Sequence, residues 1–295
     1  MAHPFCKERG GTVTIGFIGA GKVGFTLGKF FTQGSIPVTG YYSRHGESAQ
    51  AAARFTGTKA FEEIGDLVRE SDTLFLTVPD GEITSVYREV AAFGIAGKQI
   101  CHCSGASTAR ELFPGIEEAG AYGYSIHPLF PVSSKLTSYQ ELPDAFFCLE
   151  GTGPHLPEWE ARLRALGPKV RVIAPEGKIR YHAACAIASN LVCALVDESV
   201  ALLKTCGFSE QEALQALAPL MRSNLEHLIA DGPVKALTGP VERGDAGTVR
   251  RHLAALDTEA EKTMYRAVSM RLADVAARRN PGRDYEPVRN ALLGD

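Results

Sequence analysis

The feature that most constrains the fold is a glycine pattern directly after an apolar segment. Residues 13–18 are typical of a buried strand, Gly19-x-Gly21-x-x-Gly24 follows at once, and residues 25–32 are helix-like. In this order the glycines allow a tight turn, a close approach to a pyrophosphate and tight helix packing, and the helix N–H groups face the phosphates. The alternative is a glycine turn that only packs. The pattern predicts a nucleotide site formed by Gly19, Ala20, Gly21, Lys22, Val23 and Gly24.

The end of the second predicted strand indicates which dinucleotide binds there. Residues 37–42 form that strand, and Ser43, Arg44 and His45 follow it. An NAD site usually places a carboxylate at this position. A guanidinium binds phosphate through two hydrogen bonds, so this ending suits a 2′-phosphate. We expect NADP(H) as the cofactor, bound by Ser43 and Arg44; the alternative is that Arg44 is an ordinary surface arginine.

Composition excludes several classes of protein. The 295 residues are 45% hydrophobic and 22% charged, which is ordinary for a globular protein. The net charge of −3 predicts no nucleic-acid partner. No uninterrupted apolar run approaches the roughly 20 residues that span a bilayer, and no secretory signal is recognised. The seven cysteines are scattered except for Cys101-His102-Cys103. We therefore expect no metal site, no membrane partner and a cytoplasmic protein with reduced thiols.

The order of predicted elements changes at Pro175. Before it, we expect further strands at about residues 73–78, 99–103, 122–126, 145–149 and 170–174, with helices at 47–55, 62–69, 81–92 and 156–166. After it, we expect only helices, at about residues 176–206, 209–230, 248–256 and 258–279, and then a partly loose tail. Strands that alternate with helices are typical of a doubly wound sheet. The fold class is therefore α/β, with a Rossmann-type domain at residues 11–175 and an all-helical domain at 176–295.

Side-chain caps mark the starts of several predicted helices. Asp80 is placed to cap the helix at residues 81–92, and Asp245 the helix at 248–256. Ser209-x-x-Glu212 and Thr258-x-x-Glu261 have the spacing of capping boxes.

Polar residues follow several predicted strands at the sheet edge where ligands bind in open α/β sheets. Val78 and Pro79 are expected to line the cofactor. Ser104 and His127 are expected nearer the nicotinamide and the substrate, with Ser104 also touching the cofactor. The alternative for Ser104 is a helix cap, and for His127 a buried, hydrogen-bonded histidine at a strand end.

The first helix after Pro175 is the other candidate wall of the site. At about 100° per residue, Lys178, His182 and Ser189 share one face with Cys185, and Asn190 lies at its edge. Polar groups separated by small residues suit a helix that faces a ligand cleft. Close helix packing, with Lys178 solvated at the first turn, is the alternative.

Several strings together resemble one family of proteins. They are Ile18-Gly19-Ala20-Gly21-Lys22-Val23-Gly24, His102-Cys103-Ser104-Gly105-Ala106, Ser125-Ile126-His127-Pro128-Leu129, Tyr181-His182-Ala183-Ala184 with Ser189-Asn190, and Thr238-Gly239-Pro240 through Arg243-Gly244-Asp245-x-x-Thr248 to His252. They are similar to Rossmann-like NADP-dependent oxidoreductases with an appended helical domain of unknown function, related to ketopantoate reductase, β-hydroxyacid dehydrogenases and pyrroline-5-carboxylate reductases. The resemblance covers most of the chain.

The resemblance implies an NADP-dependent reductase, and some members look like an alternative class of ketopantoate reductase. Related dehydrogenases use a lysine and an asparagine on the first helix after the nucleotide domain, and Lys178 and Asn190 occupy that helix. Asn190 follows Lys178 by twelve residues, which departs from the short interval of those enzymes. His182 therefore competes with Lys178 as the proton donor, since an imidazole is a suitable general acid.

The predicted reaction is hydride transfer from NADPH to the carbonyl of a small 2-oxo acid such as ketopantoate. Lys178 or His182 would protonate the alkoxide, Asn190 and Ser104 would hold the carboxylate or hydroxyl, and His127 would line the substrate side. The alternatives are a cyclic imine reductase of the pyrroline-5-carboxylate reductase type and a non-catalytic NADPH-binding protein. A surplus of apolar helix face in the second domain predicts a homodimer.

Overall fold

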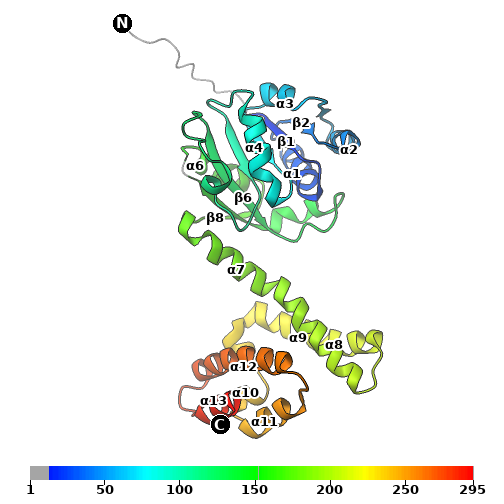
Figure 1. The fold of residues 1–295 in the computed structure, drawn as a ribbon, viewed down its shortest axis with the longest axis vertical. Helices are drawn as coiled ribbons and strands as arrows, with labels where there is room; N and C mark the ends of the chain where they lie inside the picture. Colours follow the sequence, from blue (N-terminus) through cyan, green and yellow to red (C-terminus); the bar gives the residue numbers. More distant parts are fainter. Residues whose placement is uncertain (1–12, 152, 295) are drawn as a thin grey trace. The chain divides into compact units, whose positions relative to one another are not determined.

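The computed structural model describes residues 13–151 and 153–294, drawn as the coloured ribbon of Figure 1. The chain divides into two compact units that meet in the sequence at Ser189 and Asn190. The first unit contains every strand of the sheet and the helices through α7 (Lys178–Ala188), and the second contains only helices. The first half of the helix expected at residues 176–206 thus belongs to the unit that contains the sheet, and its second half belongs to the other unit.

The first unit is built on an eight-stranded sheet in the order β3-β2-β1-β4-β5-β6-β7-β8. All neighbouring strands pair in parallel except β6 and β7, which are antiparallel. The strands are β1 (Ile15–Ile18), β2 (Val38–Tyr42), β3 (Lys59–Ala60), β4 (Thr73–Leu76), β5 (Gln99–His102), β6 (Tyr122–Leu129), β7 (Phe146–Gly151) and β8 (Lys169–Val172). The predicted Rossmann-type sheet is confirmed, although β3 and the antiparallel step were not predicted.

Helices cover both faces of this sheet. They are α1 (Lys22–Gln33), α2 (Gly46–Thr56), α3 (Ile64–Glu70), α4 (Ile83–Ala91), α5 (Ala109–Leu112) and α6 (Leu156–Ala165). Phe17 and Phe75 belong to the core that contains α1, α2 and α6 side chains, whereas Ile18 and Leu76 belong to the core that contains α3, α4 and α5 side chains. Successive strand residues face opposite sides, so apolar residues at every position of β1 and β4 build two cores.

The predicted cap at Asp80 is wrong. Residues 80–82 form a short 3-10 turn, η1 (Asp80–Glu82), and α4 begins at Ile83 without a side-chain cap. The Asp80 carboxylate instead accepts a hydrogen bond of 2.6 Å from the Ser104 hydroxyl. The Asp80 carboxylate therefore accepts from Ser104, which follows the neighbouring strand β5, and not from an N–H group of α4.

The second unit consists of the helices α8 (Asn190–Thr205), α9 (Glu210–Ala236), α10 (Pro240–Arg243), α11 (Ala246–Ala255), α12 (Glu259–Arg279) and α13 (Glu286–Leu293). Both predicted capping boxes are present, at α9 and α12. Asp245 caps α11, since its carboxylate accepts the Thr248 N–H at 2.9 Å. The expected loose tail is wrong, because Val288 and Leu292 of α13 are fully buried in the small core of this unit.

Single residues set where two predicted helices end. The helix expected at residues 176–206 is broken at Ser189, whose backbone angles of φ −124° and ψ −73° separate α7 from α8. The helix expected to end at about residue 230 is interrupted at Gly232, whose backbone is not helical, and a short further helical segment of α9 follows to Ala236. Gly232 has φ of 75°, a conformation that glycine adopts without a steric cost.

One helical stretch, Pro175–Thr205, is long and apolar enough to cross a membrane, with mean hydropathy 1.7 and 6% of its most apolar window buried. This finding does not contradict the expectation of no uninterrupted apolar run of roughly 20 residues, because an average over a window is a different property. A window average tolerates Ser189, Asn190 and a few charged residues, which interrupt a continuous apolar run. Length and composition alone do not place this helix in a membrane, because helices that bury an apolar face against protein pass the same test.

Candidate active site

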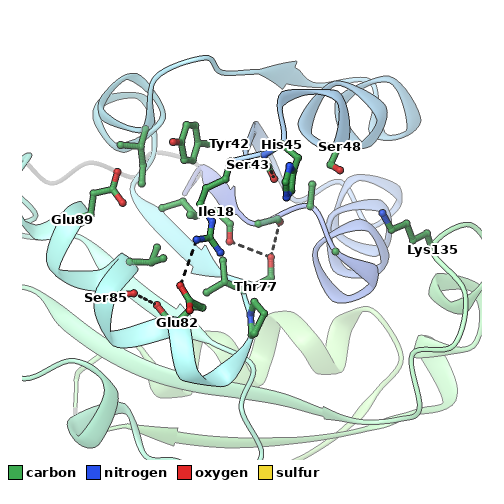
Figure 2. Close-up of a pocket in the computed structure, with 18 residues that line it drawn as sticks. Ile18, Tyr42, Ser43, His45, Ser48, Thr77, Glu82, Ser85, Glu89 and Lys135 are labelled. Atoms are coloured by element: carbon green, nitrogen blue, oxygen red, sulfur yellow. Dashed lines mark hydrogen bonds and ion pairs between the residues drawn. The ribbon is translucent and has the colours of Figure 1, made fainter.

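A cavity of about 430 Å³ lies at the carboxyl ends of β1, β2 and β4 (Figure 2). The predicted cofactor residues that line it are Gly19, Ala20, Gly21, Ser43, Arg44, Val78 and Pro79. Lys22, Val23 and Gly24 form the first turn of α1 directly behind the glycine turn. Ser104 is not part of this cavity lining. The structure thus brings most of the predicted cofactor residues together.

Close backbone contacts explain the first and third glycines of the pattern. Gly19 has φ of 103°, and a Cβ there would lie 2.6 Å from the Thr77 carbonyl oxygen. A Cβ at Gly24 would lie 2.5 Å from the Gly19 carbonyl oxygen. The Thr77 hydroxyl donates a 2.8 Å hydrogen bond to that same oxygen and fixes the turn. Larger side chains at Gly19 or Gly24 would push the turn away from β4.

The start of α1 is open to an anion. Its N-cap, Gly21, makes no side-chain cap hydrogen bond, and the nearest atom to a Cβ there would be 4.0 Å away. The N–H groups of a first helical turn have no partner within the helix, so they bind phosphate well. The empty space beside Gly21 and these N–H groups together fit a pyrophosphate.

Charged groups surround the rest of the cavity, as the labelled side chains of Figure 2 show. Nη1 of Arg44 lies 3.6 Å from a carboxylate oxygen of Glu82, and both side chains are exposed. An exposed pair of this kind contributes little, so Arg44 can turn to a ligand. Lys135 lies on the far side of the cavity from Glu89, and its ammonium is 4.8 Å from the Phe25 ring centroid of α1.

A second group of predicted residues converges on Gly105, directly after β5. A Cβ at Gly105 would lie 2.6 Å from Nδ1 of His182 and 2.9 Å from Nε2 of His127, so both imidazoles face this glycine. The other nitrogen of His127, Nδ1, lies 2.7 Å from the Tyr181 hydroxyl. Nδ1 of His182 is buried and has no hydrogen-bond partner within the described part of the chain. The two rings fill the space directly over Gly105, so this nitrogen is a buried polar atom that the described protein groups leave unsatisfied.

Burial and charge hold two histidines of this region in the neutral form. Burial, with the charges of Lys178 and His182, lowers the pKa of His127 to about 4. Burial, with the charges of Lys178 and His127, lowers the pKa of His102 to about 3. Burial also raises the pKa of Tyr181, so its phenol keeps a proton that it can donate to His127.

Lys178 is buried rather than solvated. Its side chain is 1% exposed, and Nζ donates a 2.5 Å hydrogen bond to the Ser125 hydroxyl. The Ser125 hydroxyl in turn donates to the Ser104 carbonyl oxygen at 3.2 Å. Burial lowers the pKa of Lys178, against the opposing effects of Cys148 and Glu150. The alternative of a solvated lysine at the helix start is therefore wrong.

The hydroxyl of Ser104 serves the turn that follows β5. It accepts hydrogen bonds of 3.3 Å from the N–H groups of Ala106 and Ser107, and it donates to Asp80. The capping alternative for Ser104 is thus present in the structure. The turn that it stabilises is the one that places Gly105 beneath the two histidines.

Asn190 belongs to a different unit of the chain from the other predicted catalytic residues. It is the exposed first residue of α8 and belongs to the second unit, whereas Lys178, His182, Ser104 and His127 belong to the first. The predicted polar face ends at the break at Ser189, because the helical angle on which the face depended is lost there. No group of three or more His, Cys, Asp or Glu residues able to hold a metal occurs within residues 13–151 and 153–294.

Four residues at the site were not predicted from the sequence, namely Ser125, Lys135, Glu150 and Tyr181. Ser125 is two residues before His127 and Tyr181 is next to His182, so their closeness to predicted site residues could have marked them as candidates. Lys135 follows a strand in an irregular loop and Glu150 ends an apolar strand, so no local pattern marks them.

Comparison with known families adds to this geometry. Residues 6–128 match the Rossmann-like domain family, and residues 145–272 match DUF2520, a domain of unknown function. The chain thus contains one segment similar to each of these two domain families. No curated protein matches its sequence.

Several solved structures are similar to nearly the whole chain. Protein TM1727 from Thermotoga maritima is 28% identical, with a TM-score of 0.72 over 90% of this chain and 98% of that one. BF3122 from Bacteroides fragilis, provisionally named an NADP oxidoreductase, is 18% identical, with a TM-score of 0.67 over 89% and 98%. The imine reductase from Myxococcus stipitatus in complex with NADP+ is 16% identical, with a TM-score of 0.59 over 95% and 99%. At these last two identities the likeness shows the shared fold.

Proposed function

We propose that this protein is an NADPH-dependent oxidoreductase that reduces the carbonyl of a small 2-oxo acid, such as ketopantoate, to the hydroxy acid. The observation that carries the proposal is the convergence of His127 and the unpartnered Nδ1 of His182 on Gly105. Gly105 follows β5, the neighbour of β4, whose end lines the glycine-turn cavity. A carbonyl between the two regions would meet a hydride donor on one side and imidazoles on the other.

The cavity fits NADP(H) in its shape and in its charges. The glycine turn leaves room for a pyrophosphate beside Gly21, and free N–H groups of α1 point to it. Ser43 and Arg44 line the cavity and are proposed to bind the 2′-phosphate, and Lys135 adds a second cation to the lining. The complex of the Myxococcus stipitatus imine reductase with NADP+ supports the same cofactor on this fold. When bound, NADPH would supply the hydride.

The proposed proton donor is His182 rather than Lys178. His182 faces Gly105 with a nitrogen that has no protein partner, whereas Nζ of Lys178 is buried and bonded to Ser125. Ser104 and Asn190 are proposed to bind the substrate carboxylate or hydroxyl. Lys178 then acts as a buried positive charge that keeps His127 and His102 neutral.

A homodimer is proposed because the helices from α7 to α9 expose many large apolar side chains. These are Ile179, Ile187, Leu191, Val192, Leu195, Leu214, Leu220, Leu225, Leu228 and Ile229. Apolar surface in such amount is usually covered by a partner, and a second copy of the chain is the simplest one. We also propose a cytoplasmic location, since the described cysteines are free.

The decisive test is NADPH consumption by the purified protein with ketopantoate, measured beside NADH and beside a cyclic imine such as 1-pyrroline-5-carboxylate. NADPH-selective turnover of the 2-oxo acid, lost in His182→Gln, supports the proposal. Turnover of the imine alone replaces the substrate with that of the alternative reductase. Tight NADPH binding without turnover of either compound overturns both proposed substrates and keeps the assignment of the cofactor.

A further inference from the structure

Lys178 presents an electrostatic problem that Ser125 alone does not solve. A buried ammonium loses its hydration and is costly unless an opposite charge lies near it. Lys178 is 1% exposed, and the acceptor of its hydrogen bond, Ser125, is a neutral hydroxyl that is fully buried as well. A counter-ion is therefore required if Lys178 is to keep its proton.

The groups with the largest effects around Lys178 include a single carboxylate. Its neighbours are Cys103, Cys148, Cys185, His102, His127, Tyr181 and Glu150. Burial raises the pKa of Cys103 to about 12, and it also raises the pKa of Cys148 and of Tyr181, so these three are neutral. His102 and His127 are neutral because their pKa values are low. Glu150 is the carboxylate of this set.

Strand pairing places Glu150 on the same face as the acceptor of Lys178. Ser125 of β6 and Glu150 of β7 are direct partners in the antiparallel ladder. Side chains of direct partners point to the same side, with Cβ atoms about 5 Å apart. Both residues are buried. The Glu150 carboxylate therefore lies on the same interior face of the sheet as Ser125, which accepts the hydrogen bond from the Lys178 ammonium.

The carboxylate of Glu150 is fixed in position by the backbone. One oxygen accepts the Ala109 N–H, at the start of α5, at 2.8 Å. Burial, with the charges of Glu111 and Glu176, raises the pKa of Glu150, whereas this hydrogen bond and the charge of Lys178 oppose that rise and favour the ionised form. Glu150 and Lys178 thus support each other's charged states across the β6–β7 pair.

We propose that Glu150 is a positioning residue, the buried counter-ion that holds the Lys178 ammonium against Ser125. The consequence for turnover rests on the proposed function: a charged Lys178 attracts an anionic 2-oxo acid to the strand ends. Loss of that charge at high pH would raise KM for the acid and leave the affinity for NADPH unchanged.

The test is a titration of Lys178 followed by NMR of protein labelled at lysine Cε, with the resonance assigned from Lys178→Arg. Glu150→Gln keeps the size of the side chain and an oxygen for the Ala109 N–H, so the fold is expected to persist. We expect the apparent pKa of Lys178 to fall by about one unit or more in this variant. Glu118→Gln removes an equal charge from an exposed site and is expected to leave that pKa unchanged.

Glu150→Asp keeps the charge and is expected to remain near the wild-type titration, which separates charge from packing. In the activity assay, Glu150→Gln should raise KM for the 2-oxo acid at alkaline pH, with a smaller change in kcat. An unchanged Lys178 titration in folded Glu150→Gln overturns the proposal. The titration needs no substrate, so absence of turnover would count against the proposed function and not against this counter-ion.

Discussion

The hydroxyl of Tyr181 lies 2.7 Å from Nδ1 of His127, and this contact joins the first turn of α7 to β6. The two rings meet edge to face with centroids 5.7 Å apart. Together these contacts fix the imidazole so that Nε2 points toward Gly105. A tyrosine from one element thus orients a histidine of another.

Replacing Tyr181 by Phe is expected to loosen the histidine without disturbing the cofactor. The variant keeps the ring but loses the hydrogen bond, so kcat/KM should fall by about tenfold or more, the usual size of a lost positioning contact. Steady-state kinetics would measure this fall, and the Kd for NADPH should not change. The matched control is Tyr122→Phe, because the Tyr122 ring packs on His155 away from the site. Equal losses in both variants would contradict the positioning role.

A methyl group at Gly105 is expected to displace both imidazoles. In Gly105→Ala the new Cβ would lie within 3 Å of Nδ1 of His182 and of Nε2 of His127. We expect turnover to fall by about a hundredfold, since small misplacements of reacting groups cost this much, while NADPH still binds. Gly177→Ala provides the control, because nothing lies within 4 Å of a Cβ at that position. Full activity of Gly105→Ala would remove this region from the site.

Arg44 and Lys135 are expected to affect the cofactor in different ways. Arg44→Ala should raise the Kd for NADPH by about ten- to a hundredfold, the worth of charge-assisted hydrogen bonds, and leave the weaker binding of NADH unchanged. Lys135→Ala should weaken the binding of both cofactors by a similar, smaller factor. Its ammonium lies over the Phe25 ring of α1, the helix that would face the pyrophosphate common to NADPH and NADH. Fluorescence titration measures both effects. An Arg44→Ala protein with unchanged preference would refute the 2′-phosphate assignment.

The buried histidines are expected to make stability fall in acid. The pKa of His102 is lowered to about 3 in the folded protein, below the ordinary value of about 6.5, so the unfolded chain takes up the proton first. Its contribution is complete above about pH 6.5 and is lost as pH falls toward the folded value. Between pH 6.5 and 4 this loss amounts to about 3 kcal/mol.

His102→Asn is the variant that tests this pH dependence. Asparagine can accept the Ser104 N–H that Nδ1 of His102 now accepts at 3.1 Å, and it does not titrate. Denaturant unfolding at several pH values should therefore show a shallower acid loss in the variant than in the wild type. Parallel curves for the two proteins would mean that His102 is not held neutral by the fold.

The exposed apolar helices are expected to be covered in a homodimer. Light scattering of the wild type should give twice the mass of the 31.7 kDa chain. Introducing charge with Leu220→Glu and Ile229→Glu, at side chains that are 67% and 78% exposed, should shift the mass toward the monomer. A wild-type monomer would refute the dimer, and then these substitutions should leave the mass unchanged.

Local sequence patterns predicted the elements well where the determinants lie within a few residues. The capping boxes at Ser209 and Thr258 and the cap at Asp245 join groups three residues apart, and the glycine pattern lies within one short segment, Gly19 to Gly24. The pattern failed at Asp80, whose partner Ser104 is 24 residues away, and in the tail, where α13 forms against the core of the second unit. Burial of an apolar face, rather than local propensity, stabilises such a helix.

The sequence by itself determined the Rossmann-type sheet and the residues of the glycine-turn cavity, because hydrophobic periodicity and turn chemistry are local properties. Only the tertiary structure decided the chemistry beyond the cavity. It placed Ser125 opposite Glu150, buried Lys178 against Ser125, and turned His127 and His182 to Gly105. These relations join residues from β5, β6, β7 and α7, and their charges depend on burial, which exists only once the distant segments have packed together.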